Sequence, residues 1–433
     1  MIDLILVFIS SIIFVRGLTT LIFLFQSLKW LSQKSKTGII SKNSFSNKVY
    51  LVIPVLREQD RIIETLDYIR KNVLKRNMEI LVVTTQKEFE KKFTGPSTYE
   101  LVKKYIKNNN LSKLIKLIDY PDKNSCMAHQ LNYALKQIDK DVFVSFYNAD
   151  SRPDPETFDE FYQAKEKSPK AEVFQQSAIF TKNFANLNLF LKASAILQSR
   201  WTLTHELPRL FRQSGDSPSF LKTFANAHCV GHGLIIKAGL LKSLGGFSEN
   251  CVTEDLFLGF LIRSSGANIY PLPKLELADN PKTIKSLWFQ KYVWFWGPMK
   301  YLHYLIYVIK NRRTVKIKNN LAPVAFAVQG LISAVAWLVS GPLVTIALIS
   351  PLITRNYYIA VFAMVSVFLY GPLQYFLTVR SRMINLNILD ALIISLSGIP
   401  AIVFHSLPPY HSICAELTNK FFGTKICKPK TDD

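Results

Sequence analysis

Two acidic segments contain the residues of this sequence that are best suited to chemistry. The first, Asn148-Ala149-Asp150-Ser151, ends an apolar, β-branched run, and the second, Thr253-Glu254-Asp255, opens an apolar helical stretch. A loop acid at the end of a strand can hold a divalent cation, and a carboxylate at the start of a helix can act as a general base. Together the two segments suggest metal-assisted transfer chemistry.

Asp150 is the candidate metal ligand. Mg²⁺ in phosphate sites usually takes only one or two carboxylates, and substrate phosphates and water complete its shell. One acid at a strand end is therefore enough. Taken alone, Asp150 is more simply explained as a turn aspartate that starts the Ser-Arg-Pro-Asp-Pro bend.

Glu254 and Asp255 are the candidate bases. Thr253 suits a helix N-cap, which places both acids in the first helical turn, where the helix dipole stabilises negative charge. A carboxylate kept ionised beside a bound hydroxyl can take its proton. The alternative, which wins if the segment is taken alone, is an ordinary acidic helix start.

Two further segments are candidates for contact with an acceptor. His228 and His232 lie four residues apart, but the glycines around them, including Gly231, favour a loop. A structural role is the main interpretation of both histidines, with ligand or acceptor contact by His232 as the alternative. Gln290 and Trp294 belong to an aromatic, lysine-containing segment that fits either a membrane-interface belt or a stacking platform for a sugar.

The segment from residue 49 to residue 147 alternates apolar β-branched runs with stretches of helical spacing. This order predicts a mostly parallel α/β sheet with helices on both faces. Ligands of such sheets bind outside the carboxyl ends of the strands, and Asn148 to Ser151 occupies that position. The expected strands are Val49 to Val55, Glu79 to Thr84, Leu114 to Ile118 and Val142 to Tyr147, and the expected helices are Arg61 to Asn72, Tyr99 to Asn108 and Met127 to Ile138.

The composition places this sheet next to a membrane. The chain has 53 Lys and Arg against 31 Asp and Glu, a net charge of +22, yet 49% of its residues are hydrophobic. A soluble nucleic-acid binder is rarely so apolar, so we expect a lipid-bilayer partner and no nucleic acid. Three apolar stretches, Leu4 to Leu28, Ala322 to Ser350 and Tyr357 to Thr378, are long enough to cross a hydrocarbon core of roughly 30 Å.

The basic residues predict the topology. Clusters of Lys and Arg follow the first apolar stretch, precede the second and follow the third. By the positive-inside rule these clusters are cytosolic, which gives a multi-pass protein of the cell membrane with an uncleaved anchor and residues 47–320 in the cytosol. A fourth apolar stretch, Ile388 to Leu407, contains Asp390 and Pro400, and it fits either a full crossing or a re-entrant helix. The five cysteines form no metal-binding pair, so we expect reduced thiols.

In the order of its motifs, the chain resembles the membrane-integrated family 2 glycosyltransferases, which include cellulose, hyaluronan and glucosylceramide synthases. The resemblance covers roughly Lys48 to Trp296 and the flanking spans. Val52-Ile53-Pro54 with Glu58 resembles the first nucleotide-binding strand, and Gln130 to Leu135 resembles the ALNxAL motif. Asn148-Ala149-Asp150 occupies the place of the DxD motif. Gly245-Gly246-Phe247 and Thr253-Glu254-Asp255 match the GGF and TED motifs, and Gln290 with Trp294 fits the ends of the Q/RxxRW motif.

This sequence departs from the family pattern at four places. The segment Val83 to Gln86 lacks the aspartate that usually holds the nucleoside, and Asn148 replaces the first acid of the DxD motif. Cys126-Met127 replaces a common Gly-Lys pair, and Val293 replaces an arginine. These departures weaken inferences about which nucleotide is bound, whereas the metal acid and the base are retained.

The resemblance implies an inverting glycosyltransferase with a GT-A, Rossmann-like cytosolic domain flanked by transmembrane helices. It implies Asp255 and Glu254 as catalytic residues, Asp150 as the ligand of Mg²⁺ or Mn²⁺, and a UDP- or GDP-sugar donor. The donor-binding residues would be Pro54, Glu58, Thr84, Asn148 and Asp150, and the acceptor-binding residues would be Gly231, His232, Gln290 and Trp294.

The expected organisation is an anchor (1–28), a basic linker (29–47), the GT-A domain (48–286), interfacial helices (287–319), a C-terminal membrane region (320–408) and a basic tail (409–433). Three functions stay open at this point. They are a processive polysaccharide synthase, a single-transfer enzyme acting on a membrane lipid, and a catalytically degenerate scaffold or transport subunit of a glycan-export system.

Overall fold

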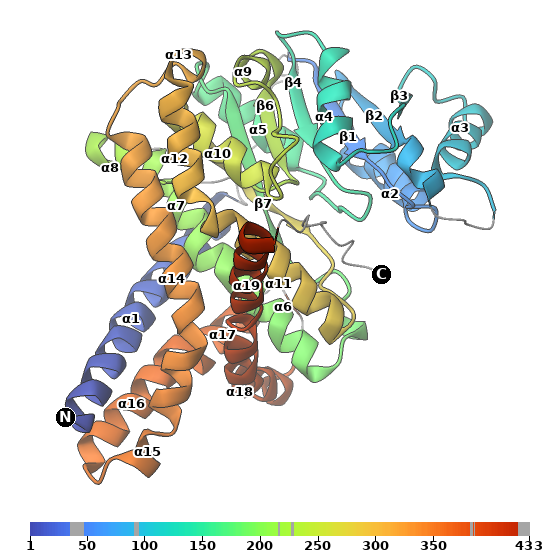
Figure 1. Cartoon of the computed structure of the whole chain (residues 1–433). Coiled ribbons are helices and arrows are strands. Elements are labelled where there is room, and N and C mark those ends of the chain that lie inside the picture. The colour runs from blue at the N-terminus through green and yellow to red at the C-terminus, as the bar shows by residue number, and fades with distance from the viewer. Residues whose placement is uncertain are drawn as a thin grey trace.

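The computed structural model combines a sheet domain with a bundle of long apolar helices (Figure 1). The structure describes residues 1–34, 47–90, 95–214, 217–226, 229–381, 384 and 386–422. Several predicted features therefore lie outside the described residues. They are residues 35–46 of the basic linker, His228, Arg382 and the end of the basic tail.

The predicted alternation of strands and helices is confirmed, and the strand boundaries differ from the expected ones by at most two residues. Apolar β-branched runs form the strands because their side chains are buried on both faces of a parallel sheet. The first half contains β1 (Val49–Pro54), α2 (Ile62–Tyr68), β2 (Met78–Thr85), α3 (Thr98–Asn108), β3 (Ile115–Tyr120), α4 (Met127–Lys136) and β4 (Phe143–Phe146). The second half adds α5 (Thr157–Lys167), β5 (Val173–Ile179), β6 (Leu234–Lys237), α9 (Ala238–Ser243), α10 (Glu254–Ser264) and β7 (Ile269–Leu277).

Within the described residues, these strands form one mixed sheet in the order β3-β2-β1-β4-β6-β5-β7. The pairs β3–β2, β2–β1, β1–β4 and β5–β7 are parallel, and β6 runs antiparallel to both β4 and β5. The mostly parallel α/β sheet is thus confirmed. The strands β1 and β4 end at the same edge, which is where ligands of such sheets bind.

The two faces of the sheet are covered by separate hydrophobic clusters. One contains Phe143, Phe161 and Phe174, in which the ring of Phe161 lies edge-on to the other two at 5.1 Å between centroids. The other joins α4 and α10 to the sheet through Leu131, Phe146 and Phe260. Edge-to-face rings add to the burial of apolar area, so the sheet is a rigid base for the loops at its edge.

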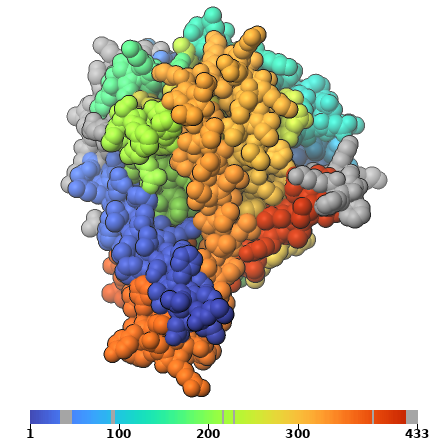
Figure 2. Space-filling view, turned by 60° about the vertical axis from the view of Figure 1, so that its left-hand side comes forward, coloured from blue at the N-terminus to red at the C-terminus, as the bar shows by residue number. Residues whose placement is uncertain are grey.

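Among the described residues, four helical segments are long and apolar enough to cross a membrane. Helix α1 (Ile2–Lys34) has 33 residues and a length of about 50 Å. The others are α14 (Ala322–Leu348), α16 (Tyr357–Tyr370) with α17 (Pro372–Arg380), and α18 (Ile388–His405) with α19 (Pro408–Phe422). Figures 1 and 2 show α1 beside the helices of the C-terminal half at the narrow end of the molecule.

Close helix contacts hold this bundle together. A Cβ added to Gly17 of α1 would lie 3.1 Å from the backbone nitrogen of Tyr370, so the small residue lets α1 and α16 approach closely. On the side toward the sheet domain, α6 (Leu189–Trp201) packs against α17 and α18. The sheet domain and the apolar helices therefore share an interface.

The helix bounds differ from the expected domain limits in three places. Helix α1 continues to Lys34, so the start of the expected linker is helical. The region expected to hold interfacial helices contains α11 (Ile284–Met299), α12 (Tyr301–Lys310) and α13 (Arg312–Val315). The fourth apolar stretch is helical as α18, and α19 extends into the expected tail.

Candidate active site

The loop after β4 is held firmly at the edge of the sheet. The Tyr147 hydroxyl hydrogen-bonds Gln176 at 2.6 Å, and the backbone N–H of Asn148 donates to the Ser151 hydroxyl at 3.0 Å. The Thr65 hydroxyl also donates to the carbonyl oxygen of Ala149. These bonds fix the backbone on both sides of Asp150, so its carboxylate has a defined position.

Asp150 lies in a setting that disfavours an uncompensated negative charge. Burial raises the pKa of its carboxyl group, and the nearby carboxylates of Glu276 and Asp279 raise it further. Lys182 binds the Asp150 carbonyl oxygen at 2.9 Å and the Asp279 carboxylate at 3.2 Å. A divalent cation would relieve the repulsion that this group of acids creates.

His232 forms an ion pair beside this loop. Its Nδ1 lies 2.8 Å from Glu276 Oε2. Burial alone lowers the pKa of the imidazole, but the charge and hydrogen bond of Glu276 outweigh it and bring the pKa to about 9. His232 is therefore protonated at neutral pH and cannot use Nδ1 as a metal ligand in this state.

Helix α10 presents the second acidic segment. Thr253 is its N-cap residue, and Glu254 and Asp255 lie in its first turn, as expected, but the Thr253 side chain makes no capping hydrogen bond. The Thr253 hydroxyl lies 3.1 Å from the Tyr304 hydroxyl instead. Asp255 Oδ1 accepts the Leu256 N–H at 2.8 Å, and Oδ2 points toward Gly231, where an added Cβ would lie 3.3 Å from it.

The turn before α10 explains two glycines of the sequence pattern. Gly245 and Gly246 have φ values of 91° and 77°, which favour glycine. A Cβ on Gly246 would also overlap the Asn132 side chain of α4. Asn132 accepts the Phe247 N–H at 2.9 Å and donates to the Phe247 carbonyl oxygen at 2.8 Å, so α4 holds this turn directly.

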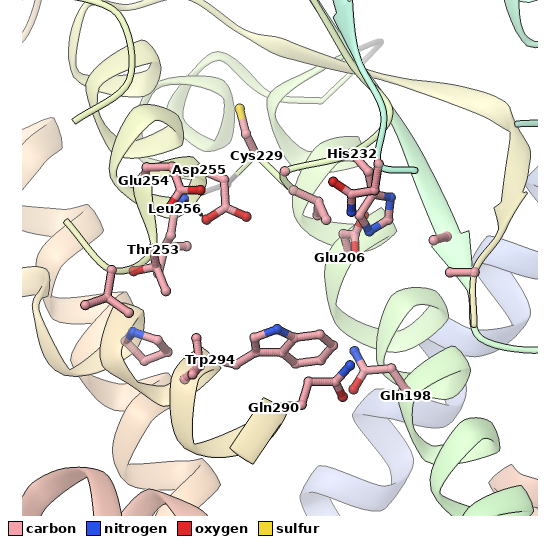
Figure 3. A pocket seen from close by; sticks show the side chains of 18 of the residues that line it. Gln198, Glu206, Cys229, His232, Thr253, Glu254, Asp255, Leu256, Gln290 and Trp294 are labelled. Atoms are coloured by element: carbon pink, nitrogen blue, oxygen red, sulfur yellow. Dashed lines mark hydrogen bonds between the residues drawn. The ribbon is translucent and has the colours of Figure 1, made fainter. Parts of the chain in front are cut away.

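One cavity of about 1390 Å³ brings most of the predicted site residues together. In Figure 3, Asp255 and His232 lie on one side of its open space, and Trp294 and Gln290 lie on the other. The predicted residues that line it are Pro54, Asn148, Asp150, Gly231, His232, Glu254, Asp255, Gln290 and Trp294. Glu58 and Thr84 do not line it: the Thr84 hydroxyl donates to Asp119 at 2.7 Å, and the neighbouring Thr85 faces the cavity.

Helix α11 supplies the wall of the cavity opposite α10. Trp294 and Gln290 line this wall, and the buried Lys291 lies between them in sequence. Its Nζ donates to Gln198 at 2.8 Å and lies 3.7 Å from the centre of the Trp294 ring. Burial holds the pKa of Lys291 well below its usual value. The lysine fixes the Trp294 ring as a flat surface in the cavity.

Several cavity residues were not predicted from the sequence. Gln198 and Glu206 carry no local motif and reach the cavity only through the fold. Arg16 could have been found, because an arginine inside an apolar span is costly and usually functional. Examples of such residues are Arg16, Thr85, Gln198, Arg200, Arg209 and Glu206.

The residues at the strand edge fit a divalent cation that is shared with a substrate. The described residues contain no group of three or more His, Cys, Asp and Glu side chains arranged to hold a metal by themselves. Mg²⁺ that bridges phosphates needs only one or two protein carboxylates, and Asp150 provides one in the cavity. The partly desolvated acids around it also favour a cation there.

Comparison with solved structures supports the fold. The mannosyltransferase PcManGT from Pyrobaculum calidifontis, in complex with GDP-Man and Mn²⁺, aligns over 97% of this chain and 100% of its own, with a TM-score of 0.51 and 16% identity. S. aureus TarS, residues 1–349, aligns over 74% of this chain and 89% of its own at 16% identity, but its TM-score of 0.36 is too low to support an argument. No curated protein sequence matches the chain.

A sequence model of one enzyme family covers the whole sheet domain. It matches residues 46–294, which include both acidic segments and end at Trp294. The expected GT-A-like α/β architecture agrees with this match and with the fold of the mannosyltransferase. The chain belongs to the glycosyltransferase-like family 2 and is a glycosyltransferase.

Proposed function

We propose that this glycosyltransferase is an inverting, metal-dependent membrane enzyme that transfers a sugar from a nucleotide-sugar donor to a glycan or lipid acceptor. The observation that carries the proposal is the single cavity shared by Asp150, at the strand edge, and Asp255, at the start of α10. A donor bound at the strand edge would have its anomeric carbon in the same space as the base.

The chemical step is a direct displacement. An acceptor hydroxyl attacks the anomeric carbon from the face opposite the nucleoside diphosphate, so the new C–O bond forms as the bond to the phosphate oxygen breaks. Asp255 takes the hydroxyl proton on Oδ2, because Oδ1 already accepts the Leu256 N–H. The displacement inverts the configuration at the anomeric carbon.

The donor would lie along Pro54, Thr85, Asn148 and Asp150. Asp150 would hold Mg²⁺ or Mn²⁺, which when bound neutralises charge on the diphosphate leaving group. The complex of the similarly folded mannosyltransferase with GDP-Man and Mn²⁺ supports a nucleotide-sugar donor and a divalent cation. The nucleotide of the donor is either UDP or GDP. The sequence does not choose between them, since the family's nucleoside-binding aspartate is absent after β2.

The acceptor would enter from the other side of the cavity. Gly231 and His232 border the space near Asp255, and Trp294 offers the apolar face of a ring to a sugar. Residues of α14, α16 and α18 line the same cavity. This continuity supports an acceptor that is associated with the membrane, whether it receives one sugar or many.

The test is a screen of nucleotide sugars with purified protein in detergent, with Mg²⁺ or Mn²⁺ and with membrane lipid extract as the acceptor source. We expect one donor to release its nucleoside diphosphate in a cation-dependent reaction, and product length on a gel separates processive from single transfer. If every UDP- and GDP-sugar is left intact, the proposed transfer is refuted, and the alternative of a catalytically degenerate scaffold or transport subunit is favoured.

The proposed topology can be tested by labelling in intact cells. In a cysteine-free background, Glu90→Cys on the sheet domain should resist an impermeant thiol reagent, whereas Tyr358→Cys at the start of α16 should react, because we place it outside. Tyr358 is 82% exposed, so its accessibility depends on the side of the membrane. Labelling at position 90 would contradict the cytosolic assignment.

A further inference from the structure

The cavity continues from the sheet domain into the bundle of apolar helices, and this inner part is rich in arginine. Its walls carry Arg16 from α1, Arg200 from α6, and Arg209 from α7 (Leu207–Gln213). Ser333 and Trp337 of α14 line the same part. We call this region, defined by these five residues, the arginine chamber.

Arg16 is the least expected member of the chamber. It lies near the middle of an apolar helix that could span a membrane, where a charge is costly unless it has a partner or a function. Its described partners are neutral: the Ala336 carbonyl oxygen at 3.4 Å and the Tyr370 ring, whose centre is 5.6 Å away. Neither partner neutralises the guanidinium.

Arg200 has the same kind of surroundings. Its side chain donates to the Tyr370 carbonyl oxygen and, at 3.3 Å, to Gln374, and it lies 5.0 Å from the centre of the Tyr370 ring. The Nε of Arg200 is buried without a hydrogen-bond partner in the described part of the chain. Arg200 is 3% exposed, so this is a cation withdrawn from water and held by neutral groups.

The arginines are close enough to act on one another. The ring of His205 stacks on Trp201, at 6.1 Å and 7°. Burial and then the charges of Arg16, Arg209, Arg200 and Arg212 hold the pKa of His205 well below its usual value. The adjacent acid, Glu206, has a pKa of about 7 because it is buried, so it supplies at most a partial negative charge. The neutral partners of Arg16 and Arg200 therefore leave the chamber with positive charge.

We propose that the arginine chamber binds the phosphate group of a membrane lipid, and that this lipid is the acceptor of the proposed transfer. The inference thus rests on the proposed function. The acceptor would have an apolar chain between the helices, a phosphate or diphosphate among the arginines, and a head with a free hydroxyl that reaches Asp255.

Phosphate is the anion that fits best. Guanidinium groups bind phosphate through paired N–H donors, and buried guanidinium groups with neutral partners, such as Arg16 and Arg200, favour an anionic partner. The chamber is bordered by α1, α14 and α16, whereas the proposed diphosphate site of the donor lies at the strand edge beside Asp150. Trp337 and Ser333 give the chamber mixed apolar and polar walls, as a lipid headgroup region requires.

The test measures lipid binding directly, with purified protein in detergent. Tryptophan fluorescence is titrated with dioctanoyl phosphatidic acid, with dioctanoylglycerol, which has the same chains without the phosphate, and with inorganic phosphate. We expect saturable binding of phosphatidic acid at least about tenfold tighter than that of either control. Equal affinity for dioctanoylglycerol would overturn the phosphate site, and equal affinity for inorganic phosphate would overturn the lipid assignment.

Variants locate the site. Arg16→Gln should weaken phosphatidic acid binding about tenfold or more, and Arg16→Lys should restore part of it. Arg212→Gln is the matched control, because Arg212 acts on His205 but does not line the cavity, and it should change the affinity less than about threefold. Unchanged binding in Arg16→Gln would refute the chamber. If Arg16→Gln does not fold, the comparison of the three ligands with the wild-type protein still tests whether a lipid phosphate is bound.

Binding of the nucleoside diphosphate with Mn²⁺ is measured in the same samples. It should be unchanged in Arg16→Gln. A loss of nucleotide affinity with unchanged lipid affinity would assign the arginines to the donor and refute this inference. Selective lipid binding by a protein that turns over no donor would instead refute the proposed function and leave the lipid site in place.

Discussion

Replacement of Asp255 by asparagine tests the proposed chemistry most directly. Asparagine has nearly the same shape, and its carbonyl oxygen can still accept the Leu256 N–H that Oδ1 accepts at 2.8 Å. The other oxygen, which points toward Gly231 and the cavity, becomes an amide nitrogen that cannot take a proton. The substitution therefore removes the base and keeps the local geometry.

The expected loss is large compared with any structural effect. General base catalysis contributes about 10²- to 10⁴-fold, which is about 3 to 5.5 kcal/mol of transition-state stabilisation. Loss of a favourable charge at a helix start costs about 1 kcal/mol or less of folding stability. We therefore expect transfer to fall at least about 100-fold while thermal stability changes little.

The assay measures transfer of a radiolabelled sugar and donor affinity in the same preparation. Donor binding should persist, since the donor is assigned to the strand edge. Asp159→Asn is the control: it makes the same change in the first turn of α5, at a residue that pairs with Lys75 at 2.7 Å and does not line the cavity. Transfer by Asp255→Asn within about threefold of the control would refute the assignment of the base.

Three further predictions concern the cation, the turn and a buried acid. Asp150→Asn should abolish the stimulation of turnover by Mn²⁺ while the melting temperature stays within a few degrees, and full cation-dependent activity would remove Asp150 from the site. Gly246→Ala should lower the free energy of unfolding by at least about 2 kcal/mol, because the new methyl group overlaps a side chain of α4 and the backbone is also strained. Gly245→Ala has open space around it, so it should introduce backbone strain alone. Equal melting temperatures for the two glycine variants would contradict this reasoning. Glu206 loses its proton near pH 4.5 in the unfolded chain and near pH 7 in the folded protein, so the stability of the wild type should fall as the pH rises between these values. Relative to the wild type, Glu206→Gln should gain up to about 3 kcal/mol of stability from pH 5 to pH 8. A difference in stability that does not change with pH would show that the acid is not buried as described.

The local pattern of the sequence was sufficient for the elements and their order. Runs such as Val49 to Val55 are short, β-branched and apolar, and each returned as a strand because buried parallel strands need that composition. The position of Asp150 followed from the same rule, since the acid lies in the loop after the strand that ends at Phe146. The apolar spans were equally clear, because only length and hydropathy are needed to recognise them.

Side-chain direction was less predictable at the ends of elements. Successive side chains of a strand point to opposite faces, so an error of one residue exchanges Thr84 for Thr85 at the cavity. Thr253 occupies the expected N-cap position of α10, but its hydroxyl contacts a tyrosine 51 residues later instead of capping the helix. A local pattern cannot include such a competing partner.

The sequence by itself determined the family, the strand-end acid, the acids at the start of α10 and the apolar spans, because each of these depends on neighbouring residues. Only the tertiary structure decided which distant groups share the cavity. The ion pair of His232 with Glu276 joins residues 44 positions apart, and Arg16 and Arg200 meet at Tyr370 from three separate helices. Burial and charge at these positions are properties of the packed chain, since they depend on which helices exclude water from the same space.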